Sequence, residues 1–127
     1  VKTRFRLNYA ESQKDWRIYF RVANQTLERN GLKNSLDQAN QYAWKLYENC
    51  DDQKVLAGCV EWMAKVVTAE PDYARQDTYA ALLYKTGAFD DALAAAEKAI
   101  EYGLKEDQKV EETKELIEKI KATKKGK

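Results

Sequence analysis

The sequence predicts an all-α fold built from repeated pairs of helices, on three observations. Only one proline and five glycines occur among 127 residues, which is little turn chemistry for an all-β protein. Apolar residues recur at intervals of three and four along most of the chain, the period of an amphipathic helix. The motif Y-A-x-x-L-Y begins at Tyr42 and again at Tyr79, a spacing of 37 residues. Self-similarity at such a period indicates a helical repeat.

The N-terminal region, residues 1–31, is predicted to be a partial or degenerate repeat. Phe5, Leu7 and Tyr9 indicate the tail of one helix. A second helix is expected over residues 12–30, with Ser12 and Asp15 in capping positions. Its apolar stripe consists of Trp16, Tyr19, Phe20, Ala23 and Leu27. Because the chain begins at Val1 with these features, we expect it to start inside a repeat.

Residues 36–71 are predicted to form the first clear pair of helices. Ser35 and Gln38 have the spacing of a capping box at the start of a helix. The dipeptide Asp51-Asp52 precedes the second helix, where carboxylates accept hydrogen bonds from unpaired backbone N–H groups. Pro71 ends that helix because proline has no N–H to donate.

Residues 73–103 are predicted to form the second pair. Asp72 precedes its first helix in a capping position, and Gly87 suits the left-handed turn that ends it. The dipeptide Asp90-Asp91 opens the next helix, and Gly103 is expected to end it. Paired aspartates also occur in metal sites, but no third ligand converges on either pair, so we interpret both as residues of helix starts.

The two pairs are expected to differ in the length of their turns. The apolar series that begins at Cys59 recurs from Ala92, a spacing of 33 residues, whereas the tyrosine motifs are 37 residues apart. Four extra residues are therefore predicted between the helices of the first pair, around residues 48–55.

A capping helix is predicted over residues 108–122. Val110, Leu116, Ile117 and Ile120 give it one apolar face. Interleaved lysines and glutamates cover the rest, as is typical of a solvated helix face. A terminal repeat needs such a polar outer surface to stay soluble.

The composition argues against several classes of function. Because 22 Lys and Arg balance 21 Asp and Glu, the net charge of +1 gives no electrostatic reason for nucleic-acid binding. No apolar run approaches the ~20 residues of a membrane-spanning helix, so we expect no membrane insertion. The chain has no histidine, two cysteines outside any Cys-x-x-Cys motif, and no glycine-rich phosphate loop. We therefore predict no catalytic residue, metal site or cofactor, and a chain that is not an enzyme by itself.

Residues 73–102 resemble a tetratricopeptide repeat. The family's small, aromatic and glycine positions are occupied by Ala80, Tyr84, Gly87, Phe89, Ala92, Ala96 and Ala99. Residues 36–71 match the pattern less fully, at Ala43, Leu46, Tyr47, Cys59, Met63 and Pro71. The resemblance implies a right-handed superhelix of antiparallel helix pairs, closed by the C-terminal capping helix.

A narrower resemblance covers YAWKLYENCDD, the segment from Ala69 to Gly103, and the charged final helix. These look like the repeat region that follows the thioredoxin domain in some bacterial envelope proteins. That likeness implies a periplasmic or cell-envelope location. It also implies an alternative function, as the C-terminal repeat region of a thiol:disulfide oxidoreductase whose active site lies outside this chain.

The tetratricopeptide resemblance implies a concave groove that binds a peptide or protein surface, lined by the first helix of each pair. The residues expected there are Asn40, Trp44, Tyr47, Glu48, Asp77, Ala81, Tyr84 and Lys85. Tyr47 and Tyr84 occupy equivalent positions, so packing between helices is an alternative role for both. We predict an interaction or scaffolding module whose partner is another protein, a peptide, or an adjacent domain of the same protein. Its affinity is expected to depend little on salt, because aromatic burial dominates.

The two cysteines allow two interpretations. A disulfide between Cys50 and Cys59 would close a loop of ~10 residues. Alternatively, Cys59 fills the small-residue position that Ala92 occupies in the next pair, because a free cysteine is a small and well-buried apolar residue. We predict the second arrangement.

Overall fold

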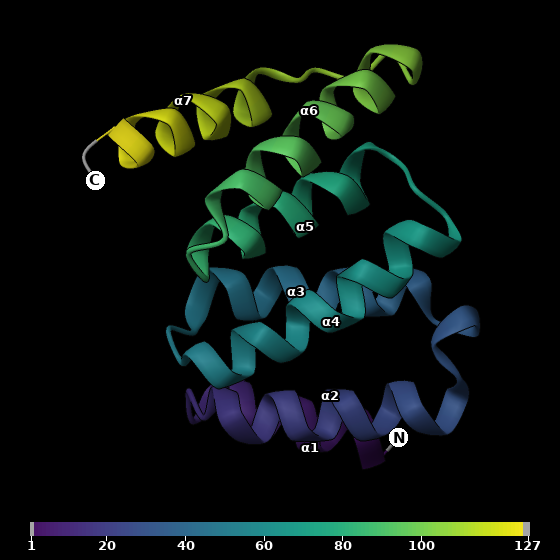
Figure 1. Cartoon of the computed structure of the whole chain (residues 1–127). Helices are drawn as coiled ribbons and strands as arrows, with labels where there is room; N and C mark the ends of the chain where they lie inside the picture. Colours follow the sequence, from purple (N-terminus) through teal and green to yellow (C-terminus); the bar gives the residue numbers. More distant parts are fainter. Residues whose placement is uncertain (1, 126–127) are drawn as a thin grey trace.

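Seven α-helices and one short 3₁₀ helix make up residues 2–125, the part of the chain that the computed structural model describes (Figure 1). No strand occurs in this part, so the all-α prediction is confirmed. None of these helices is long and apolar enough to cross a membrane. The elements are α1 (Lys2–Ser12), α2 (Trp16–Asn30), η1 (Leu32–Asn34), α3 (Leu36–Asn49), α4 (Gln53–Ala69), α5 (Tyr73–Lys85), α6 (Phe89–Lys105) and α7 (Glu111–Lys125).

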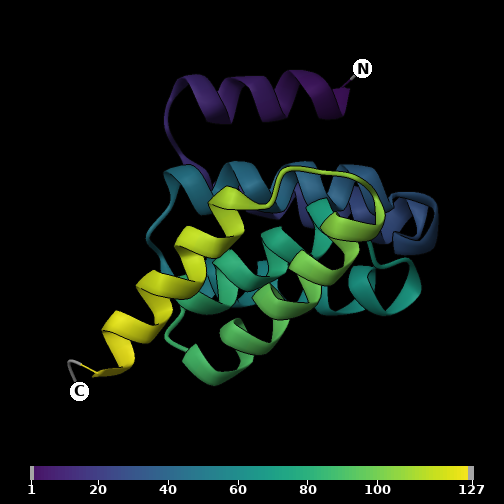
Figure 2. The same cartoon turned by 90° about the horizontal axis from the view of Figure 1, so that it is seen from above.

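The helices pack as neighbouring pairs in chain order. Figure 1 shows α1 with α2, α3 with α4, and α5 with α6 as successive tiers. The tiers are joined by contacts of α2 with α3, of α4 with α5, and of α3 with α5. In the view from above, α7 runs obliquely over the last tier, where it contacts α6 and α5 (Figure 2).

Most of the predicted helix boundaries are confirmed, and their chemistry is local. The carboxylates of Asp15, Asp52 and Asp72 each accept hydrogen bonds from backbone N–H groups in the first turn of α2, α4 and α5. These groups have no partner inside the helix, which is why a carboxylate stabilises the helix start. Gly87 has φ +89°, the left-handed conformation predicted for it.

Two serine predictions are wrong. Ser12 ends α1 instead of starting α2, and its hydroxyl donates to the carbonyl of Tyr9 at 2.8 Å. Ser35 directly precedes α3 as expected, but its side chain makes no capping hydrogen bond. Its backbone N–H instead donates to the carbonyl of Leu32 at 2.9 Å, closing the 3₁₀ turn that leads into α3.

Gly103 does not end its helix, because α6 continues to Lys105. A Cβ atom on Gly103 would lie 2.5 Å from Val110 Cγ1 and 3.0 Å from Tyr73 Cδ1. The glycine therefore permits close packing of α6 against the start of α5 and the segment before α7. Asp107, with φ +60°, adopts the left-handed conformation that follows the helix end.

The connections within the last two complete pairs have equal lengths. Residues 50–52 join α3 to α4, and residues 86–88 join α5 to α6. The prediction of a longer first turn is therefore wrong. Three of the four extra residues lengthen the start of α4, which Asp52 caps, and one lengthens the end of α3.

The core lies between the tiers and consists of two clusters. The larger joins α1 to α5 through the fully buried Leu46, Leu56 and Met63. The smaller lies between α5, α6 and α7 and includes Ile120. The apolar stripe predicted on α2 faces this core: Tyr19, Ala23 and Leu27 are buried, and Trp16 and Phe20 are partly buried.

Candidate binding cleft

A cleft of about 390 Å³ lies where α3, α5 and α7 meet. It contains four of the eight residues predicted for the groove, namely Asn40, Trp44 and Glu48 of α3 and Asp77 of α5. The remaining lining residues are Gln41, Lys45, Tyr73, Ala74, Thr78 and Glu112. We name this site the α3–α5–α7 cleft.

The other four predicted residues do not line this cleft, because they pack between helices. Lys85 Nζ donates to the backbone carbonyl of Tyr47 and lies 5.1 Å from the centroid of its ring. The hydroxyl of Tyr84 lies 3.3 Å from Thr123 Oγ1 on α7. Ala81 is buried. Tyr47 and Tyr84 therefore pack between helices, the alternative role given for them above.

The carboxylate of Asp77 is at the end of a chain of two hydrogen bonds in the cleft. Thr113 Oγ1 lies 2.7 Å from Asp77 Oδ1 and 2.8 Å from the hydroxyl oxygen of Tyr73. An ionised carboxylate only accepts hydrogen bonds, and a threonine hydroxyl carries one proton. Thr113 therefore donates to Asp77, and Tyr73 donates to Thr113. Asp77 Oδ2 has no hydrogen-bond partner within residues 2–125.

Burial is the main influence on the pKa of Asp77. Loss of solvent raises the pKa of this carboxyl above its ordinary value of 3.8. The hydrogen bond from Thr113 works against that rise, and the negative charge of Glu112 adds to it. The carboxylate is thus held at the cleft at a cost in solvation, which a cationic partner would offset.

Trp44 and Asn40 form another part of the cleft lining, and Tyr47 supports Trp44 from outside the lining. The rings of Trp44 and Tyr47 stack with centroids 5.0 Å apart and planes 28° from parallel. Asn40 lies one turn before Trp44, and its Oδ1 is buried without a hydrogen-bond partner in the described part of the chain. Buried polar atoms without partners are rare in folded proteins, and this oxygen is one of them.

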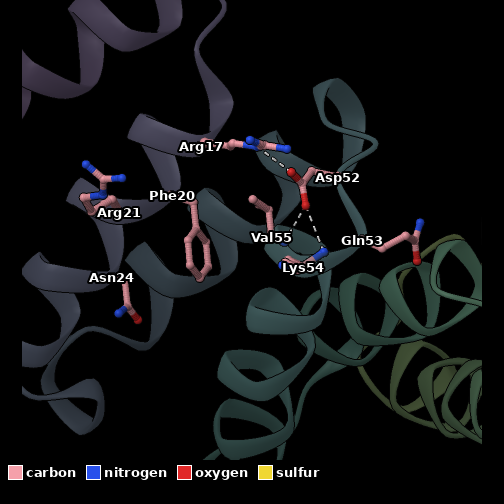
Figure 3. A pocket seen from close by; sticks show the side chains of 8 residues that line it. All are labelled: Arg17, Phe20, Arg21, Asn24, Asp52, Gln53, Lys54 and Val55. Carbon is pink, nitrogen blue, oxygen red and sulfur yellow. Dashed lines mark hydrogen bonds and ion pairs between the residues drawn. The ribbon is translucent and has the colours of Figure 1, made fainter.

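A second depression, of about 530 Å³, lies between α2 and the start of α4 (Figure 3). Arg17 Nε donates to Asp52 Oδ2 at 2.6 Å, and this hydrogen bond is the main reason why the pKa of Asp52 is lowered. Asp52 Oδ1 accepts from the backbone N–H groups of Lys54 and Val55, and Arg21 points away from this group in Figure 3. The Asp52 carboxylate and these two first-turn N–H groups are thus already paired, and the depression is a junction between two helices.

The two cysteines are buried, and Asp51 and Asp90 form ion pairs with lysines. Cys50 and Cys59 are free, buried thiols, and burial raises the pKa of Cys59 to about 12. Asp51 Oδ1 lies 3.3 Å from Lys85 Nζ, and Asp90 pairs with Lys124 on α7. Within residues 2–125 no group of three cysteines, aspartates or glutamates is arranged to hold a metal ion.

Comparisons with protein-family models, with curated protein sequences and with solved structures found no match. Sequence reasoning missed the contributions of Tyr73, Glu112 and Thr113. No local signal marks Glu112 and Thr113, because residues 108–122 are predicted only as a solvated capping helix, and the packing of α7 brings both to the cleft. Tyr73 lies one turn before Asp77 on α5, and its contact with Thr113 depends on the same packing of α7.

Proposed function

We propose that this chain is a protein–protein interaction or scaffolding module that binds a peptide or protein segment in the α3–α5–α7 cleft. The observation that carries this proposal is the convergence of Asn40, Trp44, Glu48 and Asp77. The resemblance to tetratricopeptide repeats implies that these residues share a groove, and they line one cleft. We further propose that the stacked pairs form the short right-handed superhelix of tetratricopeptide domains.

The physical basis of binding is the combination of an aromatic surface with polar groups. Trp44 is partly exposed, and its stacking on Tyr47 restricts its rotamers before any ligand arrives. A rigid aromatic side chain buries a large area at a small loss of conformational entropy, which is why tryptophan is enriched at binding hot spots. A volume of about 390 Å³ is at the lower end of the range for ligand pockets, so the cleft suits a few side chains of an extended segment.

The test is selection of binding peptides followed by substitution. Dodecapeptides selected on the purified chain from a random library are titrated against the parent, Trp44→Ala and Phe5→Ala. Phe5 is the matched control, since it is an aromatic residue on α1 that is 71% exposed and outside the cleft. We expect Trp44→Ala to weaken binding by about tenfold or more, and Phe5→Ala to leave it unchanged. Equal binding by Trp44→Ala and the parent would show that the cleft is not the binding site.

A further inference from the structure

The α3–α5–α7 cleft is locally acidic although the whole chain is nearly neutral. It contains three carboxylates, Glu48, Asp77 and Glu112, each from a different helix. Its single cation is Lys45, whose Nζ lies 2.9 Å from Glu11 Oε2. That lysine is therefore compensated by a carboxylate outside the lining. Glu48 and Glu112 are exposed and have no ion-pair partner in the described part of the chain.

Two oxygen atoms of the residues that line the cleft accept no hydrogen bond within residues 2–125. Asp77 Oδ2 has no donor among the described residues, since Thr113 bonds only to Oδ1. Asn40 Oδ1 is buried and likewise without a donor there. This second observation is independent of charge, because an amide oxygen is neutral. The face of Trp44 adds the negative π-surface that attracts cations.

Resting on the proposed function, we infer that the cleft recognises an arginine side chain of its partner segment. A guanidinium is planar, always charged and carries five N–H donors. It can bond a carboxylate with two donors while its flat face lies on an aromatic ring. Asp77 and Trp44 offer these two features from adjoining helices. A partner segment presenting a carboxylate would instead meet repulsion from three like charges.

The acidic lining changes one expectation drawn from the sequence. Affinity should depend on salt, because the exposed Glu48 and Glu112 are screened by mobile ions. The half-buried Asp77 is screened less, so part of the affinity should persist at high salt. A binding mode dominated by aromatic burial would show neither dependence on charge nor discrimination between a guanidinium and its neutral analogue.

The experiment compares arginine with citrulline, which has nearly the same shape and no charge. Peptides selected on the parent chain are synthesised with each arginine replaced in turn by citrulline. Calorimetric titration follows with the parent, Asp77→Asn and Glu112→Gln, and with Asp91→Asn as a control outside the cleft. In the parent, one citrulline replacement should lower affinity by about tenfold or more, since charge-assisted hydrogen bonds are the stronger class. Asp77→Asn should weaken the arginine peptide similarly and should bind the two peptides almost equally.

The outcomes separate this inference from the proposal on which it rests. Selected peptides that need Trp44 but tolerate citrulline would overturn arginine recognition and leave the binding cleft intact. Arginine-dependent binding that is unchanged in Asp77→Asn and Glu112→Gln would also overturn it. Failure to obtain any Trp44-dependent peptide would remove the proposed function and this inference together. Because Glu112 is exposed, Glu112→Gln is expected to fold normally, and a smaller loss of about twofold to fivefold is expected from it.

Discussion

Replacement of Thr113 by valine should reveal how α7 is held against α5. The side chain is fully buried, and its hydroxyl connects Tyr73 to Asp77 through hydrogen bonds of 2.8 and 2.7 Å. Valine keeps nearly the same shape and replaces the hydroxyl by a methyl group. The carboxylate then loses a donor, and Tyr73 loses the acceptor for its hydroxyl.

The expected loss of stability follows from the two hydrogen bonds. A bond to a charged group contributes about 1.5–3 kcal/mol and a neutral one about 0.5–1.5 kcal/mol. Two effects reduce the sum. The added methyl contributes about 0.8 kcal/mol of apolar burial, and water reaches Asp77 and Tyr73, which are only partly buried. The free energy of unfolding at pH 7 should therefore fall by about 2 kcal/mol.

Urea unfolding monitored by circular dichroism measures this change. Thr68→Val is the matched control, since Thr68 is exposed and its hydroxyl bonds only to the Ala64 carbonyl within its own helix. We expect less than about 0.5 kcal/mol from that control. Carbon-detected NMR titration should also show a higher pKa for Asp77 in the variant, because the hydrogen bond that lowers it is gone. A loss for Thr113→Val no larger than the control would refute the role of this hydrogen-bond chain.

Three further outcomes are expected. Since burial raises the folded pKa of Asp77 above 3.8, its ionised form costs stability at pH 7, a cost that disappears as the pH falls through the raised pKa towards 3.8. The free energy of unfolding of Asp77→Asn minus that of the parent, measured by urea unfolding, should therefore be larger at pH 7 than at pH 4. An equal difference at both pH values would contradict the raised pKa. Gly58→Ala should lower the free energy of unfolding by about 1–3 kcal/mol although alanine favours helices, because its Cβ would lie 2.3 Å from Phe20 Cζ; a stabilised variant in a thermal melt would be the opposing result. Cys50 and Cys59 should react slowly with Ellman's reagent in the native protein and rapidly in guanidinium, because both are buried and the pKa of Cys59 is about 12; rapid native labelling would contradict this.

Local signals account for what sequence reasoning predicted well. Asp15, Asp52 and Asp72 were placed correctly at helix starts because a cap bonds to groups two or three residues away. Gly87 was placed correctly because a left-handed turn needs only its own backbone freedom. The prediction that Gly103 ends a helix was wrong because glycine also permits the close approach of another segment. No pattern in the neighbouring residues indicates that second role.

Half of the residues predicted for the groove line the cleft, and the other half do not. The resemblance to tetratricopeptide repeats marked Asn40, Trp44, Glu48 and Asp77 as groove residues on the first helices of successive pairs. It also marked Tyr47, Ala81, Tyr84 and Lys85, which pack between helices instead. Helical periodicity gives the direction of a side chain to within a broad sector, and this precision does not separate a groove from the adjoining helix interface.

The sequence by itself determined the all-α class, the pairing of the central helices and most of the helix starts, because periodicity and capping act within a few residues. Only the tertiary structure decided the position of α7, which places Glu112 at the cleft and Thr113 against Asp77. It also decided that Lys45 is paired with Glu11, which leaves the cleft acidic. These contacts join residues more than thirty positions apart, and their energies depend on burial and distance, which no local pattern of residues encodes.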